Sequence, residues 1–112
     1  DIYKMAGHSE MVRVESSQWC MQDSYFEHPA AYEENSPLQH ASRINTPLLL
    51  WTGKEDPNVN PHQSMQAYLA LRRMGKPGML YQFDGEGHSL QLESNRKALS
   101  AGIKAWFDSY LK

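Results

Sequence analysis

The chain has 112 residues, of which 40% are hydrophobic and 21% are charged, and its formal net charge at pH 7 is −2. This balance excludes an intrinsically disordered chain and disfavours a dedicated nucleic-acid binder, which is normally clearly basic. No apolar run approaches the roughly 20 residues that a membrane-spanning helix needs. The composition therefore predicts a globular chain that forms one small domain or part of a larger one.

The first part of the chain, residues 1–46, shows no clean hydrophobic period. We expect an irregular, partly helical segment with short turns at residues 24–28, after Pro29 and from Ser36 onward. A segment this long and weakly periodic more often covers another part of a protein than folds as a domain of its own. Its cysteine, Cys20, is the only one in the chain, so no intrachain disulfide can form and the cellular compartment stays open.

Residues 47–112 read as a β-α-β-α succession. Residues 47–52 form a continuous apolar run, which is typical of a strand buried on both faces of a parallel sheet. A helix is predicted from Asn60-Pro61 to about Met74, where Gly75 ends it. A second strand is predicted over residues 78–83, so that strand, crossover helix and strand make a right-handed parallel βαβ unit.

The last predicted helix begins near Ser94 or Asn95. Its apolar residues recur at helical spacing and indicate a strongly amphipathic helix. The residues of this stripe are Leu99, Ile103, Trp106, Phe107 and Tyr110. We expect the stripe to pack on the sheet, as we expect of Ala67, Tyr68, Leu71 and Met74 on the helix before it.

Two titratable residues follow the two predicted strands. Asp56 lies in a loop after the first strand, and His88 lies between glycine-rich turns after the second. The carboxyl ends of adjacent parallel strands meet at one edge of a sheet, where functional groups collect. The two side chains are therefore predicted to meet, although Glu55 and Asp84 are competing carboxylate partners for the histidine.

An aspartate beside a histidine has a defined chemical use. A carboxylate that accepts a hydrogen bond from Nδ1–H fixes the tautomer of the ring and leaves Nε2 free to take a proton from a hydroxyl group. The order acid loop, helix, strand, histidine loop is the one in which an α/β-hydrolase presents the last two members of a Ser…Asp…His triad. On spacing alone, a loop cap and a solvated histidine remain the competing interpretation.

A nucleophilic serine is not evident in the chain. The stretch around Ser9 begins like a nucleophile elbow, but it lacks the second glycine and a preceding strand. The remaining histidines show no metal-ligand spacing with Cys20 or with one another, and no phosphate-binding glycine loop is present. We therefore predict no metal and no cofactor.

From about Tyr32 to Lys112 the chain resembles the C-terminal end of the catalytic domain of the prolyl oligopeptidase family of serine peptidases. The family also includes dipeptidyl-peptidase and acylaminoacyl-peptidase relatives. The resemblance covers over two-thirds of the chain and rests on a set of short motifs. These motifs are Tyr32…Asn35-Ser-Pro37, Ile44-Asn-Thr-Pro47-Leu-Leu-Leu50, Gly53-Lys-Glu-Asp56-Pro-Asn-Val59, Gln63-Ser64, Ala70-Leu71…Gly75-Lys-Pro77, Tyr81…Gly85-Glu-Gly-His88 and Ala105-Trp-Phe107…Tyr110-Leu-Lys112.

The resemblance implies an α/β fold in which residues 1–112 are the C-terminal portion of an α/β-hydrolase domain. It implies that Asp56 and His88 are the acid and base of a triad that hydrolyses peptide bonds through an acyl-enzyme. In this family the serine lies in a Gly-x-Ser-x-Gly-Gly elbow upstream of what corresponds to Asp1, and no such motif is present here. We therefore expect the chain alone to be inactive and to be a piece of a longer protein.

Two other functions stay open on the sequence. One is an α/β-hydrolase acyl esterase, whose aspartate and histidine loops look alike, and the other is a non-catalytic α/β interaction module. The expected partner is a peptide substrate of the full-length parent, with no nucleic acid and no membrane. An apolar first strand that lacks its neighbour presents an open edge, so we also expect the isolated chain to self-associate.

Overall fold

The computed structural model describes Met21 and residues 23–111. The chain divides into two compact units, Asp1–Arg43 and Ile44–Lys112, and each is described by itself. Ser9 and Cys20 lie outside the described residues. Among the described residues, no helix combines the length and the apolar character needed to cross a bilayer.

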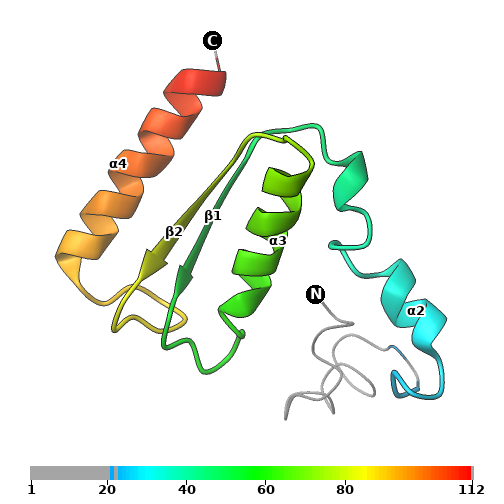
Figure 1. Ribbon diagram of the computed structural model, residues 1–112. Coiled ribbons are helices and arrows are strands. Elements are labelled where there is room, and N and C mark those ends of the chain that lie inside the picture. Colours follow the sequence, from blue (N-terminus) through cyan, green and yellow to red (C-terminus); the bar gives the residue numbers. More distant parts are fainter. Residues whose placement is uncertain (1–20, 22, 112) are drawn as a thin grey trace. The chain divides into compact units, whose positions relative to one another are not determined.

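In the first unit, the described residues form helix α2 (Pro29–Glu34) and the short 3₁₀ helix η2 (Ala41–Arg43) (Figure 1). The turns predicted here are confirmed, because Ser24 O accepts the backbone N–H of Glu27 and of His28, and α2 starts at a proline. Tyr32 is fully buried and donates a hydrogen bond of 2.6 Å to Asp23 O. Whether residues 1–46 cover another part of the protein stays a prediction.

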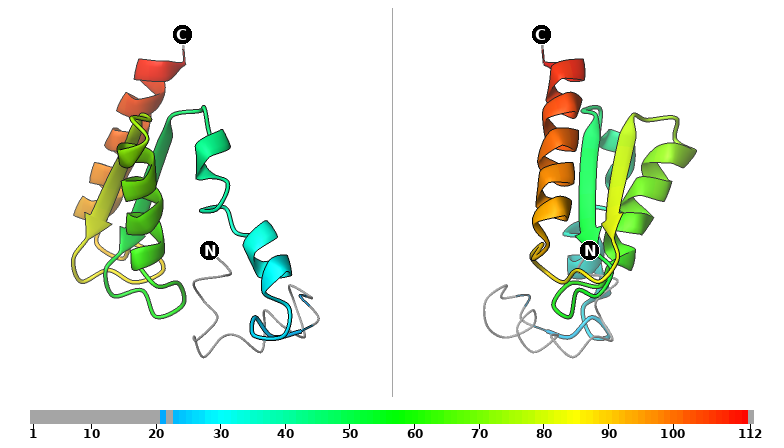
Figure 2. Two further views of the ribbon diagram at one scale, coloured as in Figure 1. Left: turned by 45° about the vertical axis from the view of Figure 1, so that its right-hand side comes forward. Right: turned by 90° about the vertical axis from the view of Figure 1, so that its left-hand side faces the viewer.

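The second unit contains strand β1 (Leu48–Gly53), helix α3 (His62–Arg73), strand β2 (Gly78–Phe83) and helix α4 (Glu93–Tyr110). The two strands pair in parallel over their whole length, with Leu48 opposite Gly78 and Gly53 opposite Phe83. The predicted parallel βαβ unit with a C-terminal helix is confirmed. Figure 2 shows α3 and α4 on opposite faces of the two strands, so the two-stranded sheet has one helix on each face.

Helix α3 begins at His62, one residue later than predicted, although Pro61 already has helical dihedral angles. Asn60 still caps the start, because its Oδ1 accepts the N–H of His62 at 2.9 Å. At the other end, Gly75 has a φ of 67°, which glycine adopts without strain, and it ends the helix as predicted. Leu71, only 1% exposed, is the deepest side chain of this helix.

The opposite face of the sheet carries the larger apolar cluster. Phe83, Leu90 and Leu99 are its buried centre, with partly buried neighbours that include Tyr81 and Ile103. Helix α4 lies close to the sheet here, because a Cβ at Gly102 would stand 2.5 Å from the hydroxyl of Tyr81. This cluster anchors both ends of the loop that joins β2 to α4, since Phe83 precedes that loop and Leu99 follows it.

The predicted burial of the apolar residues is only partly correct. Trp51, Met74, Phe107 and Tyr110 are between 38% and 52% exposed. An 18-residue helix such as α4 extends about 27 Å, whereas a 6-residue strand extends about 20 Å, so the described strands are too short and too few to cover the whole helix. The apolar face of α4 therefore extends past the sheet, which leaves Phe107 and Tyr110 partly exposed.

Candidate active site

The acid loop, residues 54–61, begins where β1 ends and contains Asp56. The side chain of Asp56 is 8% exposed. Its Oδ1 accepts the backbone N–H of Asn58 at 2.8 Å and that of Val59 at 2.9 Å, which closes a tight turn around the carboxylate. Aspartate favours this local arrangement because its short side chain can bond to the backbone two residues ahead. The turn fixes the carboxylate and leaves Oδ2 for a partner from another loop.

Backbone hydrogen bonds join the acid loop to the histidine loop, which is the segment of residues 84–92 between β2 and α4 that contains His88. The N–H of Lys54 donates to Phe83 O at 3.0 Å, which extends the ladder one step beyond the strands. The N–H of Glu55 then donates to Glu86 O at 2.9 Å. These two bonds set the spacing between the loops at the carboxyl edge of the sheet.

Gly53 lets the two loops approach this closely. A Cβ at this position would lie 2.2 Å from Gly87 O and 2.3 Å from Glu86 O, far inside contact distance. Both obstructing atoms belong to the backbone, so they cannot be displaced by turning a side chain. Any residue other than glycine at the end of β1 must push the histidine loop away.

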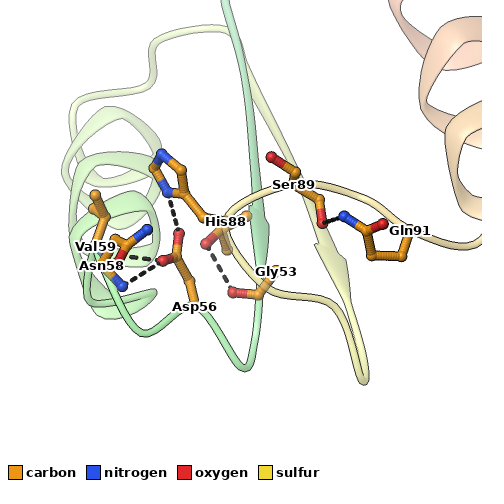
Figure 3. Close-up of polar contacts among 8 residues, drawn as sticks. Gly53, Asp56, Asn58, Val59, His88, Ser89 and Gln91 are labelled. Atoms are coloured by element: carbon orange, nitrogen blue, oxygen red, sulfur yellow. Dashed lines mark hydrogen bonds and ion pairs between the residues drawn. The ribbon is translucent and has the colours of Figure 1, made fainter.

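The side chains of Asp56 and His88 meet as predicted. Nδ1 of His88 lies 2.9 Å from Oδ2 of Asp56, and Figure 3 shows the second ring nitrogen pointing away from the carboxylate. An ionised carboxylate is only an acceptor, so Nδ1 carries the proton in this pair and Nε2 of a neutral ring carries the lone pair. The histidine side chain is 56% exposed, and none of the described residues hydrogen-bonds to Nε2.

The competing carboxylates do not reach the ring. Asp84 pairs with Lys54 at 2.6 Å, and its side chain is 84% exposed. Among residues 23–111, Asp56 is the one carboxylate in contact with His88, and Glu55 is exposed. The contact between the predicted partners is therefore present, while its catalytic role stays a prediction.

The environment of Asp56 favours its ionised form. Burial by itself would raise the pKa of Asp56, but the hydrogen bonds from Val59, His88 and Asn58, together with the electrostatic interaction with His88, outweigh this and lower the pKa below its ordinary value of 3.8. Asp56 is thus a carboxylate at any pH near neutrality, which is the state that holds an imidazole in the Nδ1–H tautomer.

This lowered pKa predicts a pH-dependent contribution to stability. The Asp56 carboxylate stabilises the fold fully above pH 3.8 and progressively less as the pH falls through its lowered folded-state pKa. Asp56→Asn should lower the unfolding free energy by about 1 kcal/mol at neutral pH, because charge-assisted hydrogen bonds become neutral ones. Urea unfolding of both proteins checks this, and a difference that stays constant on acidification contradicts it.

One buried titratable residue of this region, Glu86, is not among the residues that the sequence predicts for the site. It is 1% exposed although it lies in a loop, and its carboxylate bonds to Gln91, Leu92 and Asn95. A weak sequence indication exists: helix α4 starts after Leu92, which has no side chain able to cap it, and a glutamate precedes it by a few residues. Elsewhere in the described part of the chain, no three histidine, cysteine or acidic side chains cluster as a metal site.

A model of the prolyl oligopeptidase family matches residues 2–112. The chain belongs to the prolyl oligopeptidase family. The acylamino-acid-releasing enzyme of Sus scrofa is 30% identical over 92 residues, which are 73% of this chain and 13% of that protein. The uncharacterized peptidase YuxL of Bacillus subtilis is 31% identical over 99 residues, which are 85% of this chain and 15% of that protein.

The solved structure of a puromycin-hydrolyzing peptidase from Mycobacterium tuberculosis is similar to this chain. It matches with a TM-score of 0.60 and 35% sequence identity, over 80% of this chain and 14% of that chain. This prolyl oligopeptidase family chain thus has the fold of a portion of an α/β-hydrolase domain, which is consistent with the predicted C-terminal portion. It spans about 15% or less of the length of the relatives described here.

Proposed function

We propose that this chain supplies the acid and the base of a Ser-His-Asp triad in a serine peptidase. The observation that carries the proposal is the 2.9 Å hydrogen bond between Asp56 Oδ2 and His88 Nδ1 at the carboxyl edge of a parallel sheet. The exposed position of the histidine supports it, because Nε2 has to reach a serine hydroxyl. The serine itself belongs to residues outside this chain.

In this proposal His88 works through Nε2. It removes the proton from the serine hydroxyl as that oxygen attacks the scissile carbonyl, and it then donates the proton to the departing amine. An acyl-enzyme remains, and a water molecule activated by the same nitrogen hydrolyses it. Asp56 stays ionised throughout and stabilises the imidazolium that forms in each half of the reaction.

The proposed substrate class is peptides. The relatives are named as peptidases or as acylamino-acid-releasing enzymes, and the structural neighbour is a peptidase that hydrolyses puromycin. Two of these names contain the word peptidase and the third describes release of an acylamino acid, which favours a peptidase over the acyl esterase that the sequence left open. The family match likewise argues against a non-catalytic interaction module.

Steady-state hydrolysis of matched substrates tests the function. The full-length protein should cleave chromogenic aminoacyl anilides and short peptides, with a burst of the first product when the acyl-enzyme accumulates. Matched acyl esters without an amino acid serve as the comparison series. Faster turnover of those esters than of peptides identifies an esterase, and no turnover of either series rejects the triad.

The chain by itself should neither hydrolyse peptides nor remain monomeric. It contains no Gly-x-Ser-x-Gly elbow, and β1 pairs with β2 alone among the described residues, so one edge of an apolar strand is open. Open apolar edges pair with other strands. Light scattering should find assemblies whose mass grows with concentration, and a monodisperse monomer at high concentration contradicts this part of the proposal.

A further inference from the structure

The carboxylate of Glu86 is the most deeply buried acidic group among the described residues, although it lies in a surface loop two positions before His88. The residue is 1% exposed. Burying a carboxylate is unfavourable unless its oxygens receive hydrogen bonds that replace those to water. The buried position of Glu86 is therefore maintained by specific hydrogen-bond donors, and these donors identify the segments of chain that the carboxylate connects.

Three donors on one side of the loop bind the Glu86 carboxylate. Oε2 accepts the backbone N–H of Gln91 at 2.6 Å, and Oε1 accepts that of Leu92 at 3.0 Å. Oε1 also accepts the side-chain amide of Asn95 at 2.8 Å. Leu92 is the N-cap of helix α4 and offers no capping side chain, so Glu86 takes over this role from outside the helix.

These bonds close the histidine loop into a ring. Within the loop between β2 and α4, the side chain of Glu86 bonds to residues 91, 92 and 95, and His88 lies on the span that these bonds enclose. Leu90, 8% exposed, anchors the same span in the apolar cluster under α4. The span is therefore short and is fixed at both ends.

The backbone of Glu86 faces the acid loop at the same time. Its carbonyl oxygen accepts the N–H of Glu55 at 2.9 Å, one residue before Asp56. It also lies against the end of β1, where a Cβ at Gly53 would come within 2.3 Å of it. Glu86 is thus bonded to the acid loop through its main chain and to the start of α4 through its side chain.

We infer that Glu86 is a positioning residue that holds the imidazole of His88 within hydrogen-bonding distance of Asp56. The inference rests on the proposed function, since a positioned base matters only if His88 acts as one. The carboxylate fixes the position of the histidine loop through its hydrogen bonds to Leu92 and Asn95 at the start of α4. Without these bonds the loop keeps its bond to Glu55 but is held at its other end by the apolar packing of Leu90 alone.

The decisive variant is Glu86→Gln in the full-length protein. The amide has nearly the same shape, but it places an NH₂ group where one of the backbone N–H donors now points, so at least one bond is lost. We expect kcat to fall on the order of 10²-fold with KM nearly unchanged, because a displacement of about 1 Å in a reacting group has an effect of this size. Asn95→Ala removes one of the three donors and should lower kcat only a few-fold.

The matched control is Glu93→Gln. Glu93 lies in the first turn of the same helix, is exposed and pairs with Lys97 at 2.7 Å. It removes the same charge near the same helix terminus without touching the histidine loop. Its kcat should equal that of the unmodified protein, which separates a positioning role from a general effect of charge on α4.

A second readout does not depend on activity. The low-field Nδ1–H proton resonance of His88, assigned by its absence in His88→Ala, reports the bond to Asp56 directly. It should broaden or shift in Glu86→Gln and stay in place in Glu93→Gln. If His88→Ala retains full activity, the proposed triad fails, and this resonance still decides whether Glu86 positions the ring.

The inference is overturned if Glu86→Gln and Asn95→Ala lower only the unfolding temperature. In that outcome kcat and the His88 resonance match those of Glu93→Gln, and Glu86 is a helix cap alone. If Glu86→Gln does not fold, Asn95→Ala decides: a few-fold loss of kcat with a shifted resonance supports the inference, and no change in either contradicts it.

Discussion

Replacement of His88 by alanine in the full-length protein should lower kcat for peptide hydrolysis by about 10⁶-fold, with a much smaller effect on KM. The imidazole is the base that activates the serine in our account, and no other described side chain hydrogen-bonds to Asp56 Oδ2 and can replace it. Residual turnover over the uncatalysed reaction then comes from substrate binding and oxyanion stabilisation alone. Steady-state kinetics with a chromogenic peptide measures the loss.

Asp56→Asn should lower kcat by about 10⁴-fold, since the amide no longer enforces the Nδ1–H tautomer. The matched control is Asp84→Asn, which removes a carboxylate from the histidine loop whose side chain is 84% exposed and paired with Lys54. Its kcat should remain within about a factor of two, because surface ion pairs contribute little. Equal losses in the two variants would mean that the charge of the loop, and not the pair with His88, determines the rate.

Gly53→Ala, the third substitution, should lower both stability and kcat. Its Cβ would stand 2.2 Å and 2.3 Å from the carbonyl oxygens of Gly87 and Glu86, so the histidine loop has to move. Overpacking of this kind lowers the unfolding free energy by about 1–3 kcal/mol. Displacement of His88 from Asp56 should lower kcat by about 10²-fold in addition.

The control for Gly53→Ala is Gly75→Ala, at the other end of the sheet. Gly75 has a φ of 67° and no atom within 4 Å of its would-be Cβ. The alanine should lower stability by about 1 kcal/mol through backbone strain and leave kcat unchanged. Thermal unfolding and peptide kinetics on both variants separate the two effects. Unchanged kcat in Gly53→Ala would show that the loop contact does not position the base.

Much of the second unit follows from simple sequence patterns. The apolar run before Gly53 predicted β1 to within one residue, and residues 78–83 predicted β2 without error. Asn60 and Gly75 marked the ends of α3 because capping chemistry is local. Asp56 and His88 were identifiable because each follows a parallel strand, so topology alone brings them to one edge of the sheet.

The remaining features depend on distances that no local pattern contains. Gly53 looked like the end of a strand, and only the approach of the histidine loop shows why it has no side chain. No sequence pattern singled out Glu86, because its partners Gln91 and Asn95 are identified only when the loop folds back. The exposure of Phe107 could not be predicted either, since helical periodicity gives a face but not what covers it.

The origin of the nucleophile is the central claim, and covalent labelling tests it most directly. The full-length protein is treated with a fluorophosphonate, digested and mapped by mass spectrometry, with His88→Ala as the control. Our account predicts one labelled serine outside residues 1–112, and strongly reduced labelling in His88→Ala. A label on any serine within residues 1–112, Ser9 included, would contradict it, as would full labelling of His88→Ala.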